Sequence, residues 1–171
     1  MGKLPAPISE AESCGRLVAE RGLELVYGGA GVGLMGAAAN AALEAGGRVI
    51  GIIPERLVEW EVAHQGLSEL RVVGSMYERK QIMMDLSDAF IALPGGIGTL
   101  DEILEVMTQN ALGYFWKPVA LVNTHGFFDS FQTLLKDLEK TGFYQPRDYV
   151  IYSRNSAEAI RKLSELPIDN P

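Results

Sequence analysis

Short, nearly uninterrupted apolar runs alternate with longer helical stretches along this chain of 171 residues. The apolar runs lie at 23–27, 48–53, 70–73, 88–93, 118–122 and 149–152. Strands without polar alternation are typical of parallel sheets, because helices cover both faces of such sheets. The alternation therefore predicts an α/β fold: a Rossmann-like, doubly wound and mostly parallel sheet with helices on both faces.

Helices are predicted between these strands, at 9–21, 34–45, 75–87, 99–112, 127–140 and 156–166. Two of them open with Ser-x-x-Glu, at Ser9 and Ser75, which indicates a capping box at each helix start. The chain shows no repeat and no break in composition, and its length suits one domain. We therefore expect a single Rossmann-like domain over residues 1–171.

Composition excludes several classes of partner. With 15 Lys and Arg against 22 Asp and Glu, the net charge is −7, which disfavours nucleic acid and anionic membranes as partners. No apolar stretch is long enough to span a membrane. The single cysteine, Cys14, allows no intramolecular disulfide and fits a cytoplasmic location. Two distant histidines, His64 and His125, lack metal-ligand spacing, so no metal and no cofactor are expected.

The first glycine-rich loop follows the predicted strand 23–27 and opens the next helix. It places five glycines in the nine residues 28–36. Such a loop lets backbone N–H groups of a helix start approach an anion. It has neither the Lys-Ser/Thr of a P-loop nor an evident acidic residue for a ribose. The alternative interpretation is a tight strand-to-helix turn with close helix packing.

The second glycine-rich loop, Pro-Gly-Gly-Ile-Gly-Thr at 94–99, follows the strand 88–93 and leads into a helix. Its glycines and the Thr99 hydroxyl suit a phosphate, with Glu102 beyond it at the sugar end of a nucleotide. The alternative is a capping box, in which Thr99 caps the helix and Glu102 returns to the Thr99 N–H.

Adjacent cations, Arg79 and Lys80, lie in the first turns of the helix at 75–87. Arginine holds a phosphate or a carboxylate in a fixed fork geometry. The alternative is that both side chains belong to a charged helix face exposed to solvent.

Together these motifs resemble the Lonely Guy (LOG) family over roughly residues 2–166. The resemblance rests on Tyr-Gly-Gly-Ala-Gly-Val-Gly-Leu-Met-Gly at 27–36, Met-x-x-Arg-Lys at 76–80 and Pro-Gly-Gly-x-Gly-Thr-x-x-Glu at 94–102. Members of this family are cytokinin riboside 5′-monophosphate phosphoribohydrolases, long mislabelled as lysine decarboxylases. The resemblance implies hydrolysis of the N-glycosidic bond of an adenine-type nucleoside 5′-monophosphate, AMP or N6-prenylated AMP, to the free base and ribose 5-phosphate.

The resemblance also implies roles for individual residues. Arg79 and Glu102 would form the catalytic pair, Lys80 would assist binding, and Glu61 would be a substrate-binding acid. The residues that would hold the 5′-phosphate are Gly95, Gly96, Gly98 and Thr99. A homodimer is implied as well.

Two departures from the family pattern bear on these expectations. Ala30 stands at the third position of the usual Gly-Gly-Gly, so a negative φ is expected there. The first strand of the family, which ends in a Cys-Gly-Ser-Ser loop, is expected to be missing, because Met1 aligns just after it and Cys14 falls in a helix.

Two other functions compete with hydrolysis as interpretations of these motifs. A non-catalytic carrier of a nucleotide or of molybdenum cofactor could share this fold and keep a glycine loop, but it has no reason to keep both Arg79 and Glu102. A lysine decarboxylase would need a lysine in Schiff-base linkage to pyridoxal phosphate. Lys80 lies next to Arg79, which argues against that chemistry.

Overall fold

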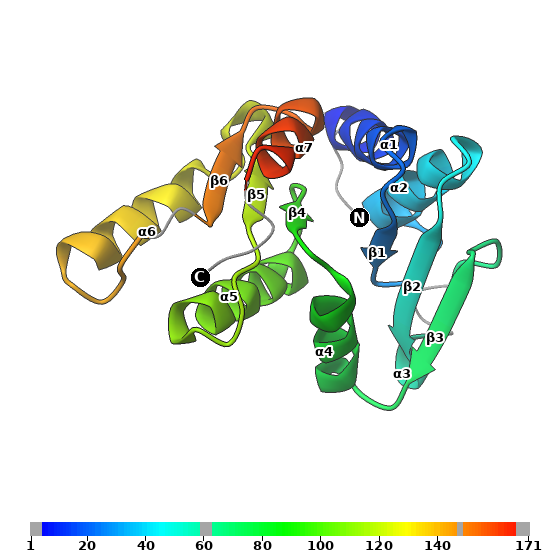
Figure 1. Cartoon of the computed structure of the whole chain (residues 1–171), viewed down its shortest axis with the longest axis horizontal. Helices are drawn as coiled ribbons and strands as arrows, with labels where there is room; N and C mark the ends of the chain where they lie inside the picture. Colours follow the sequence, from blue (N-terminus) through cyan, green and yellow to red (C-terminus); the bar gives the residue numbers. More distant parts are fainter. Residues whose placement is uncertain (1–4, 59–62, 147–148, 167–171) are drawn as a thin grey trace. The chain divides into compact units, whose positions relative to one another are not determined.

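The computed structural model describes residues 5–58, 63–146 and 149–166. The chain divides into two compact units, Met1–Ser87 and Asp88–Pro171. Each unit consists of a three-stranded parallel sheet and its helices, and Figure 1 labels these elements.

The first unit contains a sheet in the order β1-β2-β3, with all neighbours parallel. Its elements in chain order are α1 (Pro5–Glu20), β1 (Leu25–Tyr27), α2 (Gly33–Glu44), β2 (Val49–Pro54), α3 (Glu55–Val58), β3 (Glu69–Val73) and α4 (Met76–Leu86). All six residues of the central strand β2 are buried, which explains its continuous apolar sequence.

Helices cover both faces of this first sheet, since successive strand residues point to opposite sides. Val49 packs in one cluster with Ala39 and Ala42 of α2. Ile50 and its face of β2 pack with side chains of α4. Helix α1 lies against α2 at close range: a Cβ at Gly15 would overlap the Ala38 carbonyl group.

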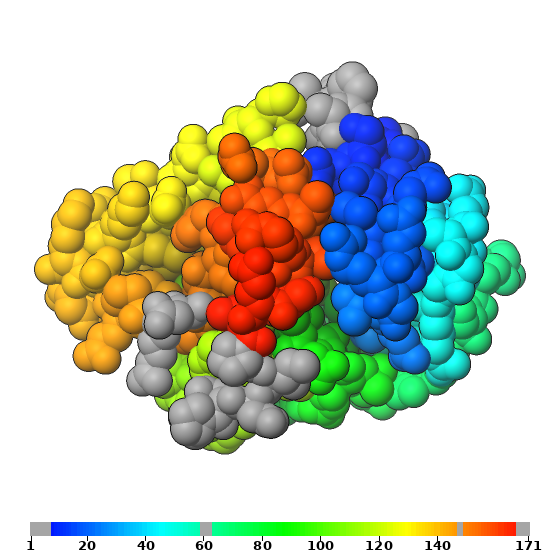
Figure 2. All heavy atoms as spheres, turned by 45° about the horizontal axis from the view of Figure 1, so that its top comes forward, coloured from blue at the N-terminus to red at the C-terminus, as the bar shows by residue number. Residues whose placement is uncertain are grey.

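The second unit contains a sheet in the order β4-β5-β6, again parallel throughout. Its elements are β4 (Phe90–Ala92), α5 (Ile97–Leu112), β5 (Val119–Val122), the short 3-10 helix η1 (Thr124–Gly126), α6 (Asp129–Lys140), β6 (Val150–Ser153) and α7 (Ser156–Ser164). Helices α6 (gold) and α7 (red-orange) are visible at the surface in Figure 2.

Two contacts fix α5 and α7 in the second unit. Ala120 and Val122 of β5 pack against Ala159 of α7. The buried Tyr149 hydroxyl donates a hydrogen bond of 3.3 Å to the Met107 carbonyl of α5. Residues 93–96 join the carboxyl end of β4 to the amino end of α5, and the second glycine loop lies there.

The structure confirms the predicted Rossmann-like α/β class, with each of the six expected strands present. Two details of the helix starts were wrong. Helix α1 begins at Pro5, so Ser9 lies inside it and is not its N-cap. Helix α5 begins at Ile97 with Gly96 as N-cap. Among the described residues no strand precedes α1, and a single domain over residues 1–171 stays a prediction.

Candidate functional site

The first glycine loop owes several of its glycines to packing and backbone geometry. Gly29 has φ +80° and Gly33 has φ +66°, in the left-handed region that favours glycine. A Cβ at Gly36 would overlap the Gly31 carbonyl group, because the first turn of α2 lies directly on the loop. These contacts support a tight turn with close helix packing. The N-cap of α2, Val32, makes no side-chain hydrogen bond, so the helix start has no side-chain cap.

Ala30 is accommodated in this loop without strain. It is fully buried and is not among the residues with positive φ. Its carbonyl accepts a hydrogen bond of 3.2 Å from the Tyr27 hydroxyl, whose pKa is raised by burial. The loop is also tied to the residues after α3, since the His64 amide donates to the Gly29 carbonyl at 3.0 Å. The expected negative φ at this departure from the family pattern is consistent with the structure.

Helix α4 carries the two cations. Its start is capped by Ser75, whose Oγ accepts from the Glu78 amide at 3.1 Å, as the Ser-x-x-Glu pattern predicts. Arg79 is only 5% exposed, so a solvated charged face was the wrong interpretation for this residue. Its guanidinium donates through Nη1 to the Met76 sulfur at 3.7 Å. Lys80 is half-buried on the same helix.

In the second glycine loop, the Thr99 side chain packs closely against Gly95. A Cβ at Gly95 would overlap the Thr99 hydroxyl and lie 2.9 Å from its Cβ. The Thr99 amide donates to the Gly96 carbonyl at 3.1 Å, within the first turn of α5. Thr99 therefore stands inside the helix, and the capping box with Thr99 as N-cap is wrong.

Gly96 and Gly98 differ from Gly95, the third glycine of the loop. Neither has a positive φ, and a Cβ at either position would meet nothing within 4 Å. The fold thus gives no steric reason for glycine at these two exposed positions. The N-cap Gly96 has no side chain that could accept hydrogen bonds from the backbone donors at the α5 start. An anion can approach those donors closely.

Glu102 lies in the second turn of α5 and is half-buried. It follows the glycine loop by one turn, so a ligand at the helix start would lie near its carboxylate. Among the remaining predicted residues, Glu61 lies outside the described part of the chain. Arg79 and Lys80 belong to the first unit, and the glycines, Thr99 and Glu102 belong to the second.

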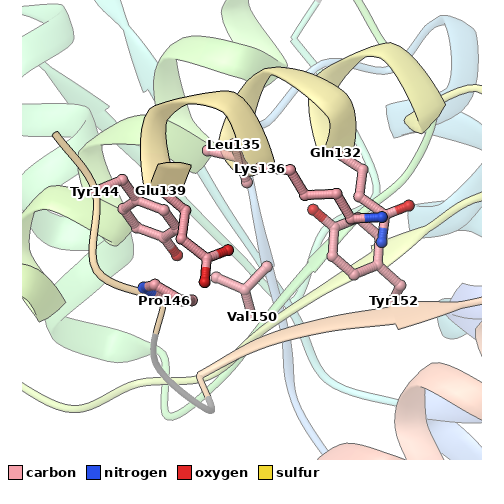
Figure 3. A pocket seen from close by; sticks show the side chains of 8 residues that line it. All are labelled: Gln132, Leu135, Lys136, Glu139, Tyr144, Pro146, Val150 and Tyr152. Atoms are coloured by element: carbon pink, nitrogen blue, oxygen red, sulfur yellow. The ribbon is translucent and has the colours of Figure 1, made fainter. Parts of the chain in front are cut away.

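A hollow of about 170 Å³ lies between α6 and β6 in the second unit (Figure 3). Burial raises the pKa of Tyr144 and of Tyr152 at its wall. None of the predicted site residues lines it. Its lining consists of Gln132, Leu135, Lys136, Glu139, Tyr144, Pro146, Val150 and Tyr152.

The described residues contain neither a metal-binding cluster nor a membrane-spanning helix. No group of three or more His, Cys, Asp or Glu side chains among them could hold a metal ion. No helix in the described part of the chain is long and apolar enough to cross a membrane.

Comparison with known proteins gives the relatives of this chain. A family model described as "Possible lysine decarboxylase" matches residues 35–163. A cytokinin riboside 5′-monophosphate phosphoribohydrolase of Rhodococcoides fascians is 47% identical over 88% of this chain and 77% of its own length. The enzyme of that name from Mycobacterium tuberculosis is 44% identical, over 88% of this chain and 82% of its own.

The chain belongs to this phosphoribohydrolase family. A plant member, LOG7 of Arabidopsis thaliana, is 40% identical over 96% of this chain and 76% of its own length. The similarity predicted from the three sequence motifs is thereby confirmed.

Solved structures agree on the fold of this phosphoribohydrolase family member. The molybdenum cofactor binding protein from Rippkaea orientalis is similar with a TM-score of 0.75 and 27% identity, over 94% of this chain and 88% of that one. A molybdenum cofactor carrier protein from Chlamydomonas reinhardtii, at 23% identity, has a TM-score of 0.73, over 95% and 88% of the two chains.

Sequence reasoning missed one contact at the site. The Arg79 guanidinium lies directly against Gly28, the first glycine of the loop after β1. No local pattern could have revealed this contact, because the two residues are far apart in the sequence and meet only in the folded unit.

Proposed function

We propose that this protein hydrolyses the N-glycosidic bond of adenine-type, N6-substituted nucleoside 5′-monophosphates and releases the free base and ribose 5-phosphate. The observation that carries the proposal is the 47% identity, over most of both chains, to a protein named for this activity. The charges of the residues assigned to the site suit this reaction.

The 5′-phosphate would bind at the start of α5. Gly96 and Gly98 leave open space there, and Gly95 makes room for the Thr99 hydroxyl. Backbone N–H groups and the positive end of the helix dipole favour an anion at this place. Lys80 would assist binding through its positive charge, and Glu61 would contact the substrate.

The chemistry at the sugar requires stabilisation of positive charge. When the C–N bond to the base breaks, the ribose approaches an oxocarbenium ion, as in glycoside hydrolysis. The Glu102 carboxylate would stabilise that charge and take a proton from the attacking water. The water oxygen then bonds to the anomeric carbon, and the leaving base takes up a proton. Arg79 would fix either Glu102 or the phosphate and so hold the substrate aligned.

Two further properties belong to the same proposal. The protein would act as a homodimer, and it would act in the cytoplasm. Gel filtration with light scattering tests the first, and fractionation of cells tests the second.

Incubation of the full chain with AMP and with N6-prenylated AMP tests the function. Chromatography should show equal amounts of free base and ribose 5-phosphate, at a higher rate from the N6-substituted nucleotide. A chain that binds the nucleotide and releases no base would contradict hydrolysis. That result would favour the carrier alternative. A solved molybdenum cofactor binding protein is similar to this chain at 27% identity.

A further inference from the structure

Gly28 faces a charged side chain across the first unit. A Cβ at Gly28 would overlap the Nη2 atom of Arg79 and lie 2.9 Å from its Cζ. Real Cβ atoms essentially never approach another heavy atom within 3.0 Å. An alanine at position 28 would therefore force the Arg79 guanidinium out of its observed position.

The backbone supplies no other reason for glycine at position 28. Its φ is not among the positive values, so an L-residue can adopt this conformation. Of the three heavy atoms nearest to the Cβ position, two belong to the Arg79 guanidinium and the third is the Met35 sulfur at 3.1 Å. Methionine is flexible and adapts its shape, which leaves the guanidinium of Arg79 as the group that a side chain here would displace.

Two sulfur atoms lie close to the guanidinium. Met35 borders the same space, and the Met76 sulfur accepts the hydrogen bond from Nη1. A thioether is a weak acceptor, and this bond helps to orient the guanidinium. Burial at this place also restricts the rotamers that Arg79 can adopt, since the side chain is only 5% exposed.

We propose that Gly28 is a positioning residue, whose missing side chain provides the seat that fixes the Arg79 guanidinium for catalysis. The catalytic part of this inference rests on the role proposed above for Arg79. The seat itself rests on the contact in the first unit alone. Gly28 thus acts through Arg79 and needs no contact with the nucleotide.

A double-mutant cycle on the full chain tests the seat without any use of activity. The variants are Gly28→Ala, Arg79→Ala and both together, and urea unfolding gives the stability of each. Gly28→Ala should lower the urea midpoint when Arg79 is present and should not lower it when Arg79 is replaced by alanine. Equal effects in both backgrounds would overturn the proposal.

Turnover of N6-prenylated AMP tests the catalytic consequence. Gly28→Ala should lower kcat at least tenfold with less than a threefold change in KM, because the displaced guanidinium is needed in the transition state. Gly47→Ala is the matched control: its Cβ would lie 2.5 Å from the Ala19 Cβ, so it clashes inside the same unit without touching Arg79. The control should lose stability and keep its kcat.

The kcat values of the two single variants distinguish the positioning role of Gly28 from the role proposed for Arg79. Full kcat in Gly28→Ala, together with a strong loss in Arg79→Ala, would overturn the positioning role. Full kcat in Arg79→Ala would instead contradict the role proposed for Arg79, whereas the stability cycle would still report on the seat.

Discussion

The substitution Gly98→Ala tests whether glycine at this position serves the stability of the fold or the binding of a ligand. Gly98 is the second residue of α5, its φ is not positive, and a Cβ there would contact nothing within 4 Å. Alanine is the better helix former by about 0.5–1 kcal/mol, because glycine loses more backbone entropy on folding. The variant should therefore be more stable by about that amount, a rise in Tm of roughly 1–4 °C for a chain of this size.

The same methyl group should weaken substrate binding. It would occupy the open space in front of the helix start, where the phosphate is proposed to accept backbone N–H hydrogen bonds. Loss of one hydrogen bond to a charged group costs about 1.5–3 kcal/mol. KM for the nucleotide should consequently rise by roughly 10- to 150-fold, since 1.4 kcal/mol corresponds to a factor of ten.

Urea or thermal unfolding measures the first effect, and steady-state release of the base measures the second. Gly113→Ala is the matched control at the other end of α5, where Gly113 is the C-cap with φ +77°. It should lose roughly 1–2 kcal/mol of stability and keep its KM. A stabilised Gly98→Ala variant with unchanged KM would refute the reasoning, because no phosphate could then lie at this helix start.

Three further predictions concern single side chains. Glu102→Gln should lower kcat by at least about 100-fold and leave the urea midpoint unchanged, and retained turnover would rule out its proposed role. The pKa of Glu158 is lowered from 4.5 to about 2, first by the hydrogen bond from the Arg154 backbone, so its carboxylate stabilises the fold above about pH 4.5 and less as the pH falls towards 2. The stability difference between wild type and Glu158→Gln should shrink over that interval, and a constant difference in acid titrations would contradict this origin. Asn110→Ala should cost about 1–3 kcal/mol in urea unfolding, because buried Asn110 bonds both the amide and the carbonyl of Lys117, and a smaller loss would show that water replaces these bonds.

Helix α5 shows how far periodicity predicts packing. The spacing of Leu100, Ile103, Leu104 and Met107 predicts one apolar face along this helix. Ile103 and Met107 are buried, whereas Leu104 is 47% exposed. The polar Asn110 is buried, because its side chain closes the turn towards β5 through Lys117. A partner from outside the helix decides this burial, and periodicity within the helix contains no information about it.

Capping motifs show a related limit. Ser-x-x-Glu occurs at Ser9 and at Ser75, but only Ser75 stands at a helix start. At Thr99 the same spacing lies inside the helix, because the helix begins at Ile97. The motif describes which residues can cap, and the preceding backbone decides where the helix begins.

The two glycine loops show the same limit of prediction from the sequence. Their position after a strand and before a helix is visible in the sequence. The contact that makes Gly28 necessary joins it to Arg79 of α4, and the open space at Gly96 is a property of the folded loop. The position of each loop between a strand and a helix was therefore predictable, and the reason for each glycine was not.

The central claim is that a 5′-phosphate anchors the substrate for cleavage of its N-glycosidic bond. The most direct test compares kcat/KM for N6-prenylated AMP with kcat/KM for the corresponding nucleoside, which lacks the phosphate. The nucleotide should be preferred by at least about 1,000-fold, the factor that corresponds to the roughly 4 kcal/mol expected from several charge-assisted hydrogen bonds. Equal values for nucleotide and nucleoside would contradict the account.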